Sequence, residues 1–155
     1  MHPRDMTRNR HFVNTATLAL IRPLQLFSTC TKQELAHIAG AMTMVTVQRG
    51  GTVVRQGTPG YEFFVIVEGW ASVTINGTRV TTLRSGEFFG EIALLDEAPR
   101  TATVVAETDL VLLVCQLSEF ASIMAASPTF TRKLLTGVTR RLGDTLRGAP
   151  EDMIA

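Results

Sequence analysis

The sequence predicts a mainly β domain, a β-roll or jelly-roll barrel with α-helices at both ends and one short helical insertion. Two observations predict this class. Between residues 43 and 116, short runs rich in β-branched and aromatic residues alternate with Gly, Pro, Asn or Asp. Before and after that region, apolar residues recur at helical spacing instead. A chain of 155 residues can bury one proper core, and a second domain would be cramped.

The N-terminal part of the chain is expected to form a tail followed by helices over residues 15–42. Residues 1–14 are polar and charged, so we expect a flexible tail. A short helix from Thr15 to Ile21 is expected to end before Pro23, since a proline disfavours helix in the residue before it. Thr31 and Glu34 have the spacing of a capping box, which predicts a helix from Lys32 to about Ala41. The apolar face of this helix consists of Leu35, Ile38, Ala39 and Met42, and His37 lies toward its polar side.

The β-roll is expected to consist of seven short strands. Asn76-Gly77, which separates two alternating runs, predicts a two-residue hairpin turn with both residues at positive φ. The expected strands are Met44–Val47, Thr52–Val54, Glu62–Glu68, Trp70–Ile75, Thr78–Leu83, Thr101–Ala106 and Leu110–Gln116.

The C-terminal part of the chain, residues 118–147, is expected to form two helices. Ser118 is suited to cap a helix over 119–126, and Ser127-Pro128 places an N-cap before a proline at the first helical position. The second helix is expected to run from Pro128 to about Arg147, followed by a short tail over 149–155. Its apolar stripe either packs on the barrel or, at its far end, closes over a ligand or pairs with a second subunit. The stripe consists of Phe130, Leu134, Leu135, Val138, Leu142 and Leu146.

Two glycines interrupt that long helix. Gly137 and Gly143 are each expected to weaken it by about 1 kcal/mol relative to alanine. We therefore expect a bendable helix.

Composition argues against several classes of partner. The formal net charge is +1, and no stripe of lysine and arginine suggests a nucleic-acid surface. A DNA-reading helix-turn-helix would have to follow the long helix, but only Gly148 to Ala155 remain, so no DNA-binding domain is expected. No run approaches the ~20 apolar residues of a membrane span. We expect a cytoplasmic protein without a membrane segment.

The reactive residues do not suggest an enzyme. His2, His11 and His37 all precede the first expected strand, so no catalytic or metal-ligating cluster is predicted. Cys30 and Cys115 are isolated and are expected to be free thiols, in keeping with a reducing compartment. No serine, histidine and acid show the arrangement of a nucleophilic triad. We therefore predict a binding protein without catalytic residues, metal or cofactor.

One stretch, from Gly86 to Thr103, combines groups suited to a small anionic sugar ligand. Gly90 permits close approach of the backbone, and the free N–H groups at the start of a helical turn at Ile92 and Ala93 favour an anion. Arg100 offers a planar fork for phosphate oxygens, and Glu91 is an acceptor suited to a ribose hydroxyl. Taken singly, each has an ordinary alternative as a turn glycine, a helix-start carboxylate or a solvated loop cation.

The order FGEIALL, four residues, then RTAT resembles the phosphate-binding cassette of the cyclic nucleotide-binding domain family. The likeness extends over roughly Leu24 to Leu146. It includes glycines at the family's usual turn positions, namely Gly57, Gly69 and Gly86. The resemblance implies one cyclic nucleotide-binding domain over residues 15–148, with the cassette as the helical insertion. It also implies a receptor that binds cAMP, with cGMP as the alternative ligand.

The resemblance further implies residue roles. The amides from Gly90 to Ala93 and the Arg100 guanidinium would hold the cyclic phosphate, and Glu91 would hold the ribose 2'-hydroxyl. Thr101 would bear on the choice between cAMP and cGMP, or it merely opens a strand. Leu142 and Leu146 would form an aliphatic lid. Residues resembling the remaining family contact positions are Val73, Val80, Phe89 and Ala102.

The family resemblance leaves the biological context open. The chain is either a receptor domain in its own right or the regulatory fragment of a larger enzyme, transporter or ion channel. In both cases the ligand would shift the population of cassette and C-terminal helix toward a closed arrangement. A second copy of the chain or an effector protein would be contacted through the C-terminal helix.

Overall fold

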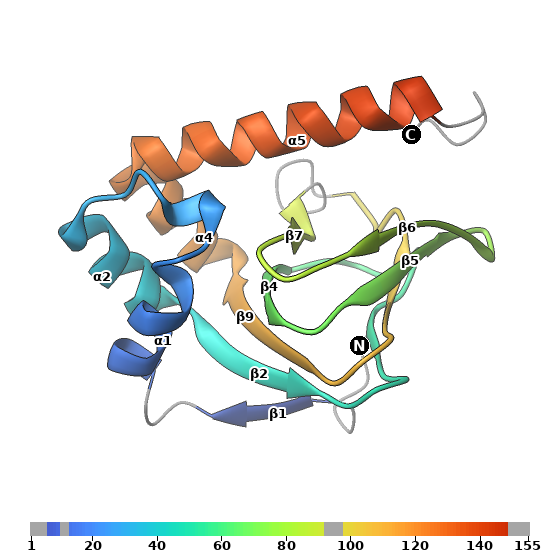
Figure 1. Ribbon diagram of the computed structural model, residues 1–155, viewed down its shortest axis with the longest axis horizontal. Helices are drawn as coiled ribbons and strands as arrows, with labels where there is room; N and C mark the ends of the chain where they lie inside the picture. The colour runs from blue at the N-terminus through green and yellow to red at the C-terminus, as the bar shows by residue number, and fades with distance from the viewer. Residues whose placement is uncertain (1–5, 10–12, 92–97, 149–155) are drawn as a thin grey trace.

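The computed structural model describes residues 6–9, 13–91 and 98–148, and within them two antiparallel β-sheets form a β-roll (Figure 1). The five-stranded sheet has the order β1-β2-β9-β4-β7, and the four-stranded sheet has the order β3-β8-β5-β6. The predicted mainly β class with flanking helices is therefore confirmed. The strands are β1 Met6–Asn9, β2 Thr43–Val47, β3 Thr52–Val54, β4 Glu62–Glu68, β5 Ala71–Ile75, β6 Thr78–Leu83, β7 Phe88–Phe89, β8 Thr103–Ala106 and β9 Leu110–Gln116.

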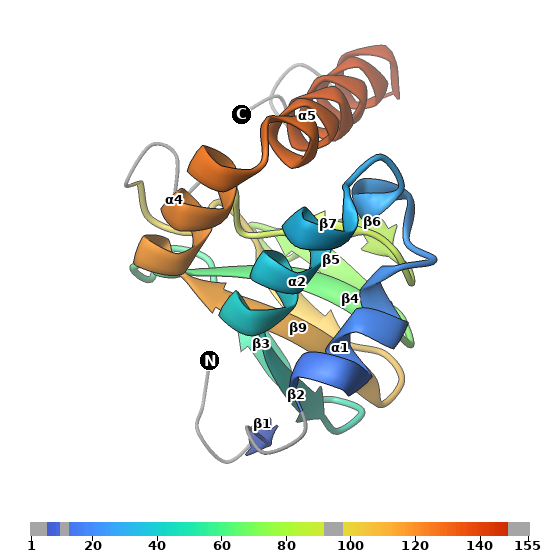
Figure 2. The same cartoon turned by 90° about the vertical axis from the view of Figure 1, so that its left-hand side faces the viewer.

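The helices gather on one side of the β-roll (Figure 2). Helices α1, α2 and α4 form a cluster beside the five-stranded sheet, and the long helix α5 extends from this cluster above strands β7 and β6 (Figure 1). In the described part of the chain, no helix combines the length and apolar character needed to cross a membrane. The helices are α1 Val13–Ile21, the 3-10 helix η2 Gln25–Phe27, α2 Lys32–Ala41, α4 Leu117–Ala126 and α5 Pro128–Gly148.

Strand β4 is buried on both faces because it separates two hydrophobic clusters. Phe63 and Val65 belong to the cluster between the five-stranded sheet and the helices. Phe64 and Ile66 belong to the cluster between the two sheets. Successive side chains of a strand point to opposite faces, so a continuous apolar run supplies both clusters at once.

The predicted strands differ from the observed ones mainly at the shortest strands. Four predicted strands have the observed bounds, and the others differ by one or two residues at one end. Strands β1 and β7 were not predicted. Residues 6–9 were expected to lie in a flexible tail, but they pair with β2 along its free edge. Both missed strands are short, and each is defined by main-chain bonds to a longer neighbour rather than by its own side-chain pattern.

Local turn and cap signals were read correctly at most positions. Asn76 and Gly77 have φ values of 51° and 80°, as the hairpin prediction requires. The capping box of Thr31 and Glu34 is present at the start of α2. Ser118 was wrongly expected to cap α4. That helix begins at Leu117, and the Glu119 carboxylate accepts the Gln116 N–H at 2.9 Å, so the cap lies two residues earlier.

The N-terminal end of α5 is attached to α2 through Glu34. The Ser127 hydroxyl donates to the Glu34 carboxylate, and the Thr129 hydroxyl donates to it at 2.8 Å. These bonds, with the Thr31 N–H, lower the pKa of Glu34 to about 2. Ser127 also caps α5 by accepting the Phe130 N–H at 3.2 Å. Phe130 is fully buried, and its ring stacks on Phe27 with 5.7 Å between the ring centroids.

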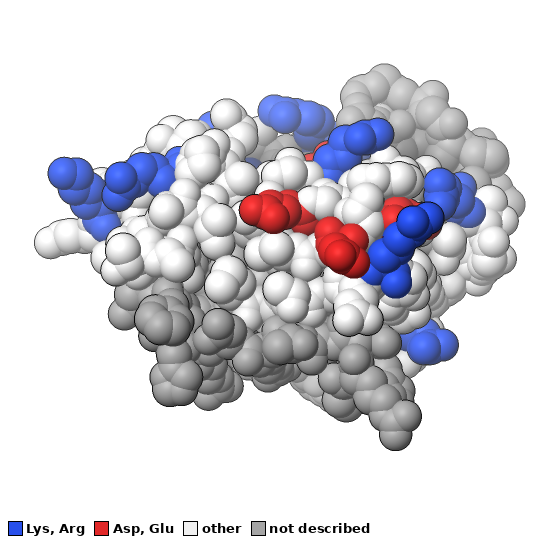
Figure 3. Space-filling model, turned by 60° about the horizontal axis from the view of Figure 1, so that its bottom comes forward, with Lys and Arg blue, Asp and Glu red and all other residues white. Residues whose placement is uncertain are grey.

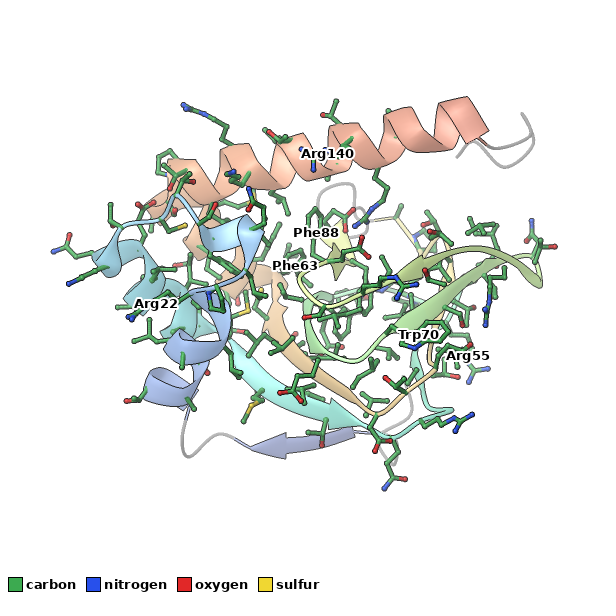
Figure 4. All side chains as sticks on the ribbon, in the orientation of Figure 1. Arg22, Arg55, Phe63, Trp70, Phe88 and Arg140 are labelled. Atoms are coloured by element: carbon green, nitrogen blue, oxygen red, sulfur yellow. The ribbon has the colours of Figure 1, made fainter. Side chains whose placement is uncertain are left out.

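Further along α5, Gly137 lies directly against strand β7. A Cβ atom added at Gly137 would lie 2.8 Å from two ring carbons of Phe88. Figure 4 labels Phe88 beneath α5 and Phe63 deeper between the helices and the strands. Gly137 therefore permits the close packing of α5 on Phe88. That the two glycines make the helix bendable stays a prediction.

Charges of both signs are exposed on the β-roll. On the face drawn in Figure 3, acidic side chains lie among basic ones, and no continuous basic stripe is seen there. This mixture agrees with the net charge of +1. Both cysteines, Cys30 and Cys115, are free thiols as predicted, and burial raises the pKa of Cys115.

Candidate functional site

Arg100 is a buried arginine whose guanidinium is oriented by main-chain oxygens. Its Nη1 donates to the Gly90 carbonyl at 3.1 Å, and its Nη2 donates to the Glu62 carbonyl at 2.8 Å. The guanidinium carbon lies 5.7 Å from the centroid of the Phe64 ring, within the range of a cation–π contact. Burial lowers the pKa of Arg100, while the neighbouring carboxylates Glu62 and Glu91 oppose that shift. A cation held in this way is preorganised to receive an anion.

Gly90 is required at its position for two reasons. Its φ of 91° lies in the region that side chains rarely adopt. In addition, an added Cβ would lie 2.7 Å from Arg100 Nη1 and 2.7 Å from the Glu62 carbonyl oxygen. The close approach of a ligand to Gly90 stays a prediction, and in the described residues the groups that come close to Gly90 are Arg100 and the Glu62 carbonyl.

Glu91 is 1% exposed and forms an ion pair with a residue of helix α5. Its Oε1 accepts from Nη1 of Arg141 at 3.1 Å. Burial raises the pKa of Glu91, and the positive charge of Arg141 opposes this more strongly than that of Arg100 does. A buried carboxylate with a nearby cation retains an acceptor oxygen for a ligand hydroxyl.

Arg141 is the site residue that sequence reasoning missed. Besides Glu91, it donates from Nη2 to the Phe88 carbonyl at 2.5 Å, and its guanidinium carbon lies 4.8 Å from the Phe88 ring centroid. In the sequence, Arg141 is one of several basic residues of the C-terminal helix that are not part of its apolar stripe. The sequence holds no signal for this role, because strand β7, which this part of the helix contacts, has no side-chain pattern of its own.

The apolar residues predicted to line the ligand divide into two groups. Phe89 and Val73 are buried, and the Phe89 ring stacks on Phe64 with centroids 4.7 Å apart. Val80 and Ala102 are half-buried and pack at the edge of the cluster between the sheets. Thr101, the predicted selectivity residue, is exposed and precedes strand β8.

The remaining predicted site residues are only partly described. Ile92 and Ala93, expected to supply amides for a phosphate, lie outside the described residues, as does the rest of the predicted cassette turn up to residue 97. Leu142, one of the two predicted lid residues, is 49% exposed on α5. The side chain of Leu146, the other, also lies outside the described part. Among described residues, no group of His, Cys, Asp and Glu is placed to hold a metal ion.

Several known proteins are similar to this chain in sequence and in fold. The chain is 36% identical over 133 residues to the cAMP-dependent protein kinase regulatory subunit of Schizosaccharomyces pombe, which covers 85% of this chain and 29% of that protein. A cAMP-binding acyltransferase from Mycobacterium smegmatis superposes with a TM-score of 0.72 at 27% identity, over 84% of this chain and 42% of the other. The catabolite activator protein of Thermus thermophilus gives 0.70 at 26% identity, over 77% and 59%.

The chain thus spans less than a third of the length of the yeast subunit and about half of the two solved structures. Residues 44–127, more than half of this chain, match the family model described as the cyclic nucleotide-binding domain. That segment contains Gly90, Glu91 and Arg100. The chain therefore belongs to the cyclic nucleotide-binding domain family.

Proposed function

We propose that residues 15–148 form a regulatory domain that binds cAMP, with cGMP as the alternative ligand, and that binding is reported by helix α5. The observation that carries this proposal is the buried pair of opposite charges beside the tight turn at Gly90: Glu91 follows Gly90 directly, and Arg100 donates to the Gly90 carbonyl. A cyclic nucleotide presents one phosphate and one ribose hydroxyl, which require these two kinds of partner.

In this proposal Arg100 binds the cyclic phosphate. The carbonyls of Gly90 and Glu62 occupy two of its N–H donors and set the plane of the fork, so other donors remain for phosphate oxygens. Because the guanidinium is already buried and oriented, little side-chain entropy is lost when the anion binds. The amides of Ile92 and Ala93 would complete the phosphate contacts.

Glu91 accepts the ribose 2'-hydroxyl while it remains paired with Arg141. Arg141 binds one carboxylate oxygen, Oε1, so the second oxygen can accept the hydroxyl. The same carboxylate then joins the ligand to α5. Ligand binding and the position of α5 are thereby coupled through one buried side chain. The ligand favours the arrangement in which α5 is closed against the site, because it binds that arrangement more tightly than the looser one.

Nucleobase selectivity is assigned to Thr101 and to the half-buried edge formed by Val80 and Ala102. An exposed hydroxyl beside Arg100 is available for the phosphate or for the exocyclic amine of a guanine. Replacing Thr101 with alanine should change the ratio of cGMP to cAMP affinity severalfold, the scale of one hydrogen bond. Equal losses for both ligands would assign the hydroxyl to the shared phosphate.

The domain acts as a binding module, either by itself or as the regulatory part of a longer enzyme, transporter or channel. Two of the similar proteins are a kinase regulatory subunit and an acyltransferase, so this kind of domain occurs in proteins of different output. The output is transmitted to an effector or a second copy through the exposed side of α5, where Leu135 and Leu142 are 53% and 49% exposed.

Calorimetric titration of the purified chain with cAMP, cGMP, 2'-deoxy-cAMP and 5'-AMP tests the proposal. We expect cAMP to bind, the 2'-deoxy analogue to bind more weakly, and the linear monophosphate to bind much more weakly. A ligand held only by the folded state should also stabilise it by about 2.7 kcal/mol at a concentration near a hundred times Kd. Silence in calorimetry and in thermal melting at millimolar cAMP and cGMP would refute ligand binding.

Two substitutions separate the assigned roles. Arg100→Ala should weaken cAMP binding by about 2 to 5 kcal/mol, since the phosphate loses its charged partner, but it should still discriminate against 2'-deoxy-cAMP. Glu91→Ala should largely lose that discrimination. Arg100 also satisfies two buried carbonyls, so the melting temperature of each unliganded variant must be compared with wild type first. Undiminished rejection of the deoxy ligand by Glu91→Ala would remove Glu91 from the ribose site.

A further inference from the structure

The main chain of Arg100 is held by a loop that contains none of the predicted ligand contacts. The N–H of Gly57 donates to the Arg100 carbonyl at 2.8 Å, and the N–H of Arg100 donates to the Thr58 carbonyl at 2.9 Å. Both main-chain polar groups of Arg100 are therefore bonded to the loop between β3 and β4, residues 55–61. The position of this loop therefore sets the position of the Arg100 backbone, from which the side chain extends.

Gln56 attaches that loop to the tip of the β5–β6 hairpin. Its side-chain Nε2 donates to Oδ1 of Asn76 at 2.9 Å, and its Oε1 accepts the N–H of Asn76 at 2.9 Å. Its own main-chain N–H donates to Oγ1 of Thr103 at 2.9 Å. Two reciprocal bonds between the same two residues restrain distance and orientation together, which one bond does not.

We propose that Gln56, through its reciprocal pair with Asn76, is a positioning residue for the anion-binding Arg100. The chain of contacts runs from the hairpin tip to Gln56, then through Gly57 and Thr58 to the Arg100 main chain. The carbonyls of Gly90 and Glu62 orient the far end of the same side chain. Arg100 is thereby restrained at its backbone and at its guanidinium. Such restraint matters for a binding group, because displacements of a fraction of an ångström weaken its contact with the ligand. The inference rests on the proposed function, since it concerns the group assigned to the phosphate.

A double-mutant cycle tests whether Gln56 acts through Arg100. Gln56→Ala should weaken cAMP binding about three- to tenfold, the scale of one lost hydrogen bond. In the Arg100→Ala background, the same change should weaken the remaining binding by less than about twofold. Equal losses in both backgrounds would overturn the proposal. Gln48→Ala, at an exposed glutamine just after β2, should leave affinity unchanged.

A second set of variants tests the pair itself. Asn76→Asp keeps an acceptor for the Gln56 Nε2. Gln56→Glu keeps an acceptor for the Asn76 N–H, and the Asn76 amide can turn to donate to it. Each single variant should bind cAMP with an affinity within about twofold of wild type. The double variant places two carboxylates against each other, so its cAMP affinity should fall to about that of Gln56→Ala. A double variant with wild-type affinity would show that the pair does not matter.

Amide hydrogen exchange of the unliganded protein supplies a readout that does not depend on binding. The amides of Gly57 and Arg100 should exchange faster in Gln56→Ala than in wild type, while those of strand β9 should not change. Unchanged exchange at Gly57 and Arg100 would overturn the positioning role. Wild-type protein that does not bind cAMP, with exchange altered as expected, would refute the proposed ligand alone and leave the restraint on Arg100 supported.

Discussion

The two ends of helix α5 are attached to the rest of the molecule by different kinds of contact. At the N-terminal end, Ser127 and Thr129 bond to Glu34 of α2, and Phe130 is fully buried against Phe27. Some three turns later, Arg141 bonds to Glu91 and to the Phe88 carbonyl, and the next residue is half exposed. One end is thus part of the core, whereas the other lies against the proposed ligand site.

This difference indicates where a ligand can act on the helix. None of the residues that anchor the N-terminal end is among the proposed ligand contacts, so occupancy of the site should leave that end in place. The contacts at Arg141 include Glu91, which is assigned to the ribose. A ligand shifts an equilibrium only through groups it contacts differently in the two states. We therefore expect α5 to move about its N-terminal anchor.

The largest expected effect is on stability at the anchored end. Phe130→Ala should destabilise the unliganded protein by about 3 to 5 kcal/mol, because it leaves a cavity among stacked rings. Leu142→Ala, at the half-exposed position of the other end, should change stability by less than about 0.5 kcal/mol. Urea unfolding of both variants measures the contrast. Similar losses would show that the two ends are equally part of the core.

The next effect concerns the ligand-site end. Arg141→Ala leaves the buried Glu91 without its cation, so we expect cAMP affinity to fall by about 1 to 3 kcal/mol. Amide exchange in the last two turns of α5 should rise, while exchange at Phe130 stays slow. Glu91→Gln should produce the same local loosening, and the double variant should add little to either single change. Additive losses would mean that Arg141 and Glu91 act independently.

Gly137 lies between the two ends and tests the packing on which the second end depends. Gly137→Ala favours helix by about 1 kcal/mol, but it places a Cβ against the Phe88 ring, so we expect α5 to shift outward. Gly143→Ala is the matched control for propensity. We expect cAMP affinity to fall about three- to tenfold in Gly137→Ala and less than about twofold in Gly143→Ala. Equal affinity of the two variants would indicate that Phe88 yields instead.

The smallest effect is the pH dependence of the anchor. The pKa of Glu34 in the folded protein, about 2, lies below the ordinary value of 4.5 for a glutamate carboxyl. Stability contributed by the ionised carboxylate is therefore fully present above pH 4.5 and is lost as the pH falls through the folded pKa. The stability difference between wild type and Glu34→Gln should shrink between those two values. A difference that stays constant over this range would remove Glu34 from the anchor.

Much of the fold was predictable because its signals are local. The hairpin at Asn76-Gly77, the capping box at Thr31 and the strand β4 each depend on residues within a few positions of one another. Arg100 and Glu91 could likewise be predicted to lie near Gly90, because all three residues belong to one short stretch; their ligand contacts stay a prediction. Strand β7 could not be predicted, because two residues carry no periodicity.

Local sequence patterns are enough to predict the β-roll, its hairpin turn and the caps at Thr31 and Ser127, and they place Glu91 and Arg100 in the same short stretch as Gly90. The partners of those two charged residues depend on how distant elements pack against them. Arg141 lies 50 positions from Glu91 and looks like any solvated cation of an amphipathic helix. Its role follows from the close approach of α5 at Gly137. The attachment of Ser127 to Glu34 likewise joins two helix starts 93 positions apart. The spacing of residues along one helix shows which side chains share a face. Which other element covers that face depends on the packing of the whole chain.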